Sequence, residues 1–141
     1  MGNVNWGRVI LGGLLAGVVI NAVEFTLHAV ILDPDWRATM AALGRPPDVS
    51  TGAMMIYVGL GFLIGILAVC YYAAIRPRFG AGPKTAAWAG YGVWLLAYLV
   101  PTIGMVPSGL FPNRLLWLPV AVALVELPLA TVVGAWLYKE D

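Results

Sequence analysis

The chain has 141 residues, of which 61% are hydrophobic and 11% are charged, and its mean hydropathy is +0.87. A soluble domain carries about 25% charged residues, so this chain has too few charges to cover a surface in water. Its formal net charge of +1 also lacks the positive excess that is typical of nucleic-acid-binding proteins. Because a membrane span takes about 20 apolar residues, the length predicts one domain of four spans over residues 1–141.

The apolar segments predict an all-α, polytopic membrane protein, in which four transmembrane helices form a bundle. After the first span, Trp36, Met40 and Leu43 are spaced by 4 and 3 residues, as on the apolar face of a helix. This spacing predicts a short helix over residues 34–43 that lies on the membrane surface, with Trp36 at headgroup depth. The four predicted spans cover residues 9–31, 53–75, 85–106 and 115–138.

Polar side chains form a stripe on the first span. Gly13, Gly17, Asn21, Glu24 and His28 are separated by 4, 4, 3 and 4 residues, so a helix places them on one face. A charged side chain at the centre of a membrane helix costs about 2.5–3.5 kcal/mol on insertion scales. A carboxylate in this stripe therefore indicates either a functional site or a contact between helices.

The second span contains Gly61 and Gly65, a GxxxG pair that lets another helix approach closely. The sequence offers no obvious partner for this pair within the chain. We therefore expect a homo-oligomer, or a subunit of a larger membrane complex, in addition to contact with the lipid bilayer.

Aromatic residues dominate the third span, with Trp88, Tyr91, Trp94 and Tyr98 close to one broad face. Pro101 should kink this helix or end its regular part early. The four rings could line a pocket for an apolar or cationic ligand, since aromatic faces attract cations. The alternative is that they pack within the bundle or lie at the membrane interfaces.

The fourth span carries the second intramembrane acid, Glu126, in a stripe with Ala123, Ala130 and Gly134. This stripe of small residues matches the one on the first span, so we expect the two helices to pack closely. Glu24 is seven residues from the end of its predicted span, about 10 Å, and Glu126 is eleven residues from the corresponding end, about 16 Å. The two acids are therefore within reach of each other.

The paired acids predict a proton, ion or small-ligand site made of Asn21, Glu24, His28 and Glu126. Like charges repel strongly in a low dielectric, so we expect at least one carboxyl group to be protonated and hydrogen-bonded to Asn21 or to the other acid. His28 lies one turn above Glu24, whose carboxylate would favour the charged imidazole. The corresponding function is a small carrier or channel-like protein.

Two other functions are compatible with the same residues. The polar stripe could hold together a structural or accessory subunit that transports nothing. Alternatively, Glu24, His28 and Glu126 could bind a metal in an intramembrane enzyme. No catalytic residue is identified, because Ser50 and Ser108 lie in loops outside any nucleophile motif. No cofactor is indicated either, and a single histidine excludes a bis-histidine haem within one chain.

Basic residues predict the orientation. Four spans place both termini and the middle loop on one side, which then holds five of the eight basic residues. We therefore expect both termini in the cytoplasm. The five are Arg8, Arg76, Arg78, Lys84 and Lys139, and the other three are Arg37, Arg45 and Arg114.

The first third of the chain resembles a family of small uncharacterised bacterial four-span membrane proteins. The resemblance rests on Asn5-Trp6 before a glycine- and alanine-rich span, and on Trp36, Met40 and Leu43-Gly44 after it. It implies a four-span architecture, in the inner membrane of a bacterium, and no function. Members of that family often have aromatic residues where this chain has Glu24 and His28, so the polar stripe is not part of the resemblance.

Overall fold

The computed structural model describes residues 4–139, and all their regular secondary structure is helical. Four continuous helical segments are long and apolar enough to cross a membrane: Trp6–Ile31, Thr51–Phe79, Pro83–Ser108 and Asn113–Ala135. The chain is therefore a multi-pass, all-α membrane protein. Its elements are α1 (Trp6–Phe25), the π-helical turn η1 (Thr26–Ile31), α2 (Asp33–Ala42), α3 (Thr51–Phe79), α4 (Pro83–Trp94), the π-helical turn η2 (Leu95–Leu99), α5 (Val100–Met105), the 3₁₀ turn η3 (Val106–Ser108) and α6 (Asn113–Ala135).

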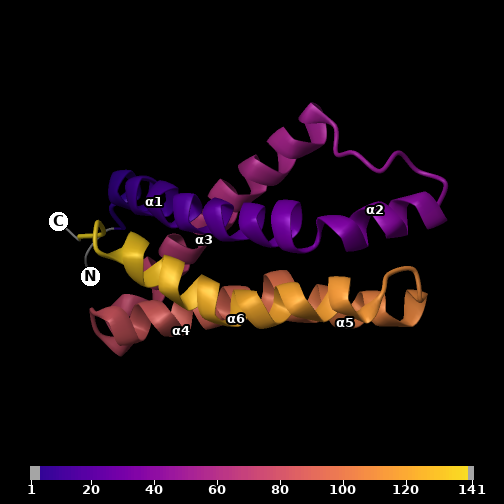
Figure 1. Ribbon diagram of the computed structural model, residues 1–141. Coiled ribbons are helices and arrows are strands. Elements are labelled where there is room, and N and C mark those ends of the chain that lie inside the picture. The colour runs from indigo at the N-terminus through magenta and orange to yellow at the C-terminus, as the bar shows by residue number, and fades with distance from the viewer. Residues whose placement is uncertain (1–3, 140–141) are drawn as a thin grey trace.

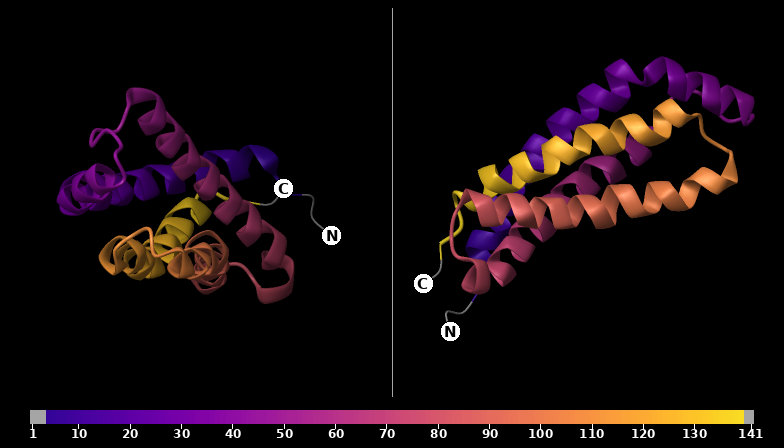
Figure 2. Two further views of the ribbon diagram at one scale, coloured as in Figure 1. Left: turned by 90° about the vertical axis from the view of Figure 1, so that its right-hand side faces the viewer. Right: turned by 90° about the horizontal axis from the view of Figure 1, so that it is seen from below.

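The four segments run up and down through one bundle (Figure 1). The described chain begins and ends at the same end as the turn between α3 and α4, whereas α2 and the turn before α6 lie at the opposite end. We call these the terminal end and the α2 end. Helix α1 packs against α3 and α6, and α4 packs against α6 and α3. Helix α3 crosses α1 obliquely, so its N-terminal half points away from the other helices (Figure 2).

Helices α1 and α3 cross at glycine residues. A Cβ atom on Gly65 would overlap the backbone of Gly13 and Gly17, and one on Gly61 would overlap the side-chain amide of Asn21. The expectation that this GxxxG pair lacks a partner within the chain is therefore wrong. Since the pair is already used in the contact between α1 and α3, it gives no reason to expect a second chain.

The contact between α1 and α6 uses a different pair of small residues from the predicted one. A Cβ atom on Gly12 would overlap the carbonyl of Gly134, and Ala16 also lies against Gly134. The two helices are neighbours, as their small residues predict, but Gly13 and Gly17 face α3. The reason is that adjacent positions on a helix differ by 100°, so one helix can present two narrow faces to two neighbours.

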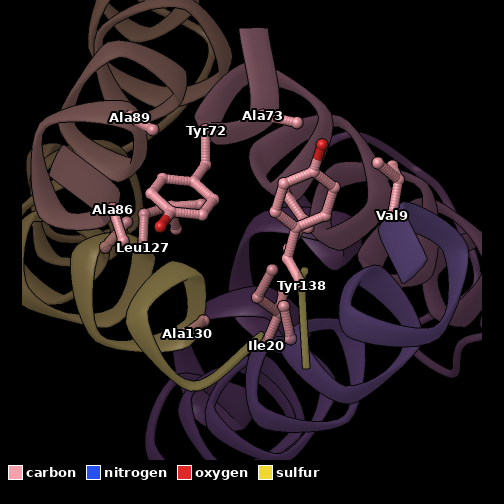
Figure 3. Close-up of a cluster of buried hydrophobic side chains, with 12 residues drawn as sticks. Val9, Ile20, Tyr72, Ala73, Ala86, Ala89, Leu127, Ala130 and Tyr138 are labelled. Carbon is pink, nitrogen blue, oxygen red and sulfur yellow. The ribbon is translucent and has the colours of Figure 1, made fainter. Parts of the chain in front are cut away.

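The main hydrophobic core lies between α1, α3, α4 and α6 (Figure 3). Six of its twelve residues are alanines, so the helix backbones lie close together. A second, smaller cluster of Leu27, Leu32 and Leu115 lies at the α2 end. The main core consists of Val9, Ala16, Ile20, Val69, Tyr72, Ala73, Ala86, Ala89, Ala123, Leu127, Ala130 and Tyr138.

Helices α1 and α3 begin before the predicted apolar spans because capping side chains lie upstream. Asn5 Oδ1 accepts a hydrogen bond from the backbone N–H of Arg8 over 3.1 Å, and Ser50 Oγ accepts one from Ala53 over 3.2 Å. Helix α3 continues to Phe79, past the predicted limit at residue 75. Helix α6 ends at Ala135, before the predicted limit at residue 138. Helix α2 begins at Asp33 and ends at Ala42, each one residue earlier than the predicted surface helix.

Candidate functional site

Glu24 lies in the last turn of α1, and each of its carboxylate oxygens lies close to one polar side chain. The hydroxyl of Tyr98 donates to Oε1 over 3.1 Å, and Nε2 of His28 lies 3.1 Å from Oε2. The side chain remains 24% exposed. Glu24 therefore connects α1 to the turn η2, which carries Tyr98, and to the turn η1, which carries His28.

The other nitrogen of His28 contacts the surface helix. Nδ1 accepts a hydrogen bond from Nε1 of Trp36 over 3.0 Å, and the Trp36 ring also packs edge-on against Phe111 at 6.0 Å. An indole N–H can only donate, so Nδ1 carries no proton in this arrangement and Nε2 carries one. The hydrogen bonds thus assign the neutral Nε2–H tautomer to His28, and the expectation of a charged imidazole is wrong for this arrangement.

Glu126 lies on α6 and is only 3% exposed. Both of its carboxyl oxygens are buried, and neither forms a hydrogen bond with any described residue. Glu24 and Tyr98 lie near enough to interact with Glu126 electrostatically. Two acids and one phenol from α1, η2 and α6 therefore meet inside the bundle.

Asn21 is not part of this acidic group. Its Nδ2 donates to the carbonyl of Gly17 over 2.9 Å and to the carbonyl of Val58 on α3 over 3.2 Å. The predicted hydrogen bond between Asn21 and a carboxyl group is therefore absent among the described contacts. Instead, Asn21 holds α1 to α3 just where α3 begins to diverge.

The four aromatic residues of the third span do not face a common space. Trp88 and Tyr91 are 64% and 38% exposed and contact each other with ring centroids 5.9 Å apart. Trp94 Nε1 donates to the carbonyl of Val120 over 2.9 Å and so attaches α4 to α6. Only Tyr98 reaches the acidic group, so the prediction of a pocket lined by all four rings is wrong.

Two apolar grooves lie elsewhere on the molecule. One, of about 370 Å³, lies between α6 and the end of the first span, beside Val23, Leu27 and Val122. The other, of about 340 Å³, lies between α3 and the α4–η2 segment, beside Tyr71 and Gly92. Neither groove is lined by an acidic residue, so neither extends the Glu24–Glu126 site.

The predicted metal ligands do not form a metal site. Within residues 4–139, no three histidine, cysteine, aspartate or glutamate side chains come together closely enough to hold a metal ion. His28 and Glu24 do contact each other. However, the remaining His28 nitrogen is engaged by Trp36 and the remaining Glu24 oxygen by Tyr98.

Both π-helical turns supply residues to the site, since η1 contains His28 and η2 contains Tyr98. In η1, the N–H of Leu32 donates to the carbonyl of Leu27 over 2.8 Å, five residues back. The turn η2 directly precedes Pro101, which lacks an N–H and prevents a regular α-helical ladder there. Such turns are rare and often occur at functional sites.

Sequence reasoning missed Trp36 as a site residue, because it assigned the indole to the membrane interface. Trp36 lies eight residues after His28 and beyond the break at Asp33–Pro34, so no helical periodicity relates the two. Tyr98 was predicted as a pocket wall rather than as a donor to Glu24. A phenol in an apolar span next to two acids is the signal that could have indicated this bond.

No family model, curated protein or solved structure matches this chain. The resemblance to small bacterial four-span proteins therefore stays a prediction, and the function has to be inferred from the site itself.

Proposed function

We propose that this protein is a small carrier or channel-like membrane protein, in which Glu24 and Glu126 bind a proton in competition with a cation or small ligand. The observation that carries the proposal is the environment of Glu126. Its two oxygens are buried without a hydrogen bond to any described residue, next to a second carboxyl group. A buried, unpaired carboxylate is strongly unfavourable, so this group needs a proton or a positively charged partner.

The two acids differ in the polar groups that surround their carboxyl oxygens. Glu24 accepts a hydrogen bond from Tyr98 at one oxygen and has Nε2 of His28 3.1 Å from the other, which is an arrangement suited to a carboxylate. Glu126 has no such donors. One proton shared by the pair would leave a single negative charge, stabilised at Glu24, and would place the proton at Glu126.

The geometry gives little support to the alternative that the acids only hold helices together. Glu126 accepts no hydrogen bond from a described donor, so a proton shared with Glu24 is the one way in which its carboxyl group would join α6 to α1. Close contact between α1 and α6 already comes from Gly12, Ala16 and Gly134, and Trp94 attaches α4 to α6. Asn21 and Glu24 do join α1 to α3 and to η2, but the accessory-subunit function gives no reason for the buried Glu126 carboxyl group.

The same proposal includes a location and an orientation. We place the protein in the inner membrane of a bacterium with both termini in the cytoplasm. Five basic residues at the terminal end against three at the α2 end support this orientation. The α2 end then faces the outside of the cell.

Infrared difference spectroscopy in lipid bilayers tests the proposal. We expect a carboxyl signal that titrates with pH, that is altered in both Glu24→Gln and Glu126→Gln, and in which each substitution shifts the remaining group, because coupled acids titrate as a pair. Asp48→Asn is the matched control, since the Asp48 side chain is 75% exposed and pairs only with Arg37 among the described residues. The proposal is wrong if the two acids titrate independently of each other.

A further inference from the structure

The exposed fraction of the site falls with distance from the α2 end. It is 33% for the side chain of His28, 24% for Glu24 and 3% for Glu126. His28 lies closest to the surface helix, and Glu126 lies deepest. The three groups thus form a continuous polar path that starts at the α2 end of the bundle.

Within residues 4–139, α6 offers no comparable run of free polar side chains from Glu126 toward the terminal end. Leu127 and Ala130, which follow Glu126 on α6, are completely buried in the main core. The one polar side chain of α6 in this region, Thr131, donates its hydroxyl to the carbonyl of Leu127 over 2.6 Å. It is therefore already engaged and cannot readily pass a proton onward.

Trp36 blocks the outer nitrogen of His28. While the indole N–H donates to Nδ1, that nitrogen cannot take up a proton from the membrane surface. If Trp36 moves away, a proton can bind at Nδ1 while the Nε2 proton passes to Oε2 of Glu24, over the 3.1 Å contact between them. One N–H bond forms, one N–H bond breaks and one O–H bond forms, which leaves a neutral imidazole and a neutral carboxyl group.

We infer that Trp36 gates proton exchange at the Glu24–Glu126 pair through Nδ1 of His28, and that the pair is open to the α2 end only. This inference rests on the proposed function, because it supplies the route by which the paired acids gain and lose protons. Release to the same surface follows the reverse steps.

The titratable and charged groups around His28 belong to four elements, α1, η2, α2 and α6, and those of α2 are paired. Glu24, Glu126 and Tyr98 lie on the side of His28 that faces the interior of the bundle. On α2, Arg37 lies 2.8 Å from Asp33, and Asp35 lies 2.6 Å from Arg114 of α6. The Arg37–Asp33 pair lies within α2, whereas the Asp35–Arg114 pair joins α2 to α6 and so helps to hold Trp36 over His28.

Nitrogen NMR of histidine-labelled protein in bilayers tests the blocked state directly. The chain contains a single histidine, so every imidazole signal comes from His28. We expect a protonated Nε2 and an unprotonated Nδ1 in the wild type, and a mixture of tautomers in Trp36→Phe but not in the matched control Trp88→Phe, whose side chain is exposed. A protonated Nδ1 in the wild type overturns the inference without any substitution.

The rate of proton uptake tests the gate and its direction. In vesicles of known orientation, a pH jump at the α2 end should change the carboxyl infrared signal, and Trp36→Phe should speed this response by about 2- to 10-fold, the equivalent of one lost hydrogen bond. His28→Phe should slow it. A jump at the terminal end should give no fast response. Orientation is read from Asp48→Cys, labelled with a membrane-impermeant maleimide.

The outcomes separate the inference from the proposed function. If no coupled carboxyl signal titrates at equilibrium, the proposed function is wrong, and the gate with it. If the equilibrium titration is as expected but Trp36→Phe does not change the rate, or both ends respond equally fast, only the gate is wrong. The Trp88→Phe control shows whether a rate change comes from losing any tryptophan.

Discussion

The hydroxyl of Tyr98 donates a hydrogen bond to Oε1 of Glu24 across 74 positions of sequence, at a distance of 3.1 Å. This bond joins η2 to α1 at the level where α6 contributes Glu126. It is therefore both a contact between membrane helices and part of the environment of the acidic pair.

We expect Tyr98→Phe to lower the free energy of unfolding by about 1–2 kcal/mol. Hydrogen bonds to charged groups are worth about 1.5–3 kcal/mol in general, whereas those between membrane helices average about 0.6 kcal/mol. Unfolding in mixed micelles of increasing denaturing detergent measures the loss. Tyr91→Phe is the control, since that residue is exposed and its hydroxyl has no hydrogen bond to a described residue. Equal losses in both variants would show that the Tyr98 bond adds nothing.

Gly65→Ala should destabilise the protein by about 1–3 kcal/mol, the usual effect of overpacking. The added methyl group would overlap the backbone of Gly13 and Gly17, which cannot move without separating α1 from α3. Gly59→Ala on the same helix should change little, because nothing lies within 4 Å of its Cβ position. The same detergent unfolding assay compares the two, and a similar effect of both would contradict the described crossing of α1 and α3.

Two substitutions of Glu24 distinguish a binding site from a helix contact. Glu24→Gln keeps the size of the side chain and should leave helix content and particle size unchanged, while the coupled titration is lost and the remaining carboxyl signal, from Glu126, is shifted. Glu24→Leu removes all hydrogen bonding at this position. Circular dichroism and size-exclusion chromatography report the fold, and infrared spectroscopy reports the titration. A Gln variant that titrates normally would exclude Glu24 from the site.

The contribution of Arg37 to stability should not change between about pH 6 and 9. The hydrogen bond and charge of Asp33, with the charge of Asp48, raise the pKa of Arg37 further above its already high ordinary value. A raised pKa in a cationic group gives stability that is complete below the unfolded pKa and is lost only as pH rises through the folded one. The difference in unfolding free energy between wild type and Arg37→Gln, measured across this range, should therefore be constant. A slope within it would mean that another group titrates with the pair.

Composition and apolar length were sufficient to predict the fold class. Four segments of about 20 mostly apolar residues, with at most one acid in each, have one stable arrangement, a set of helices in lipid. The direction of each small-residue face was harder to predict. Gly12 and Gly13 are adjacent, and only the packed bundle shows that the first faces α6 and the second faces α3.

The acidic pair could be predicted from depth along two antiparallel helices, because carboxylates in apolar spans are rare and helical rise is fixed. The hydrogen-bond donors around the pair could not be predicted in this way. The bond from Trp36 to His28 depends on how the chain turns at Leu32, and the bond from Tyr98 to Glu24 depends on the widened turn before Pro101. Such irregular turns follow from tertiary packing rather than from residue spacing.

The π-helical turn η1 makes the site sensitive to chain length as well as to residue type. Each residue removed from a helix rotates everything beyond it by about 100° and shifts it by 1.5 Å. Loss of one residue between Phe25 and His28 would turn His28 away from Glu24, and loss of one between His28 and Leu32 would turn Trp36 away from His28. In comparing this chain with any relative, a one-residue gap in Thr26–Ile31 would therefore matter as much as the replacement of an acid.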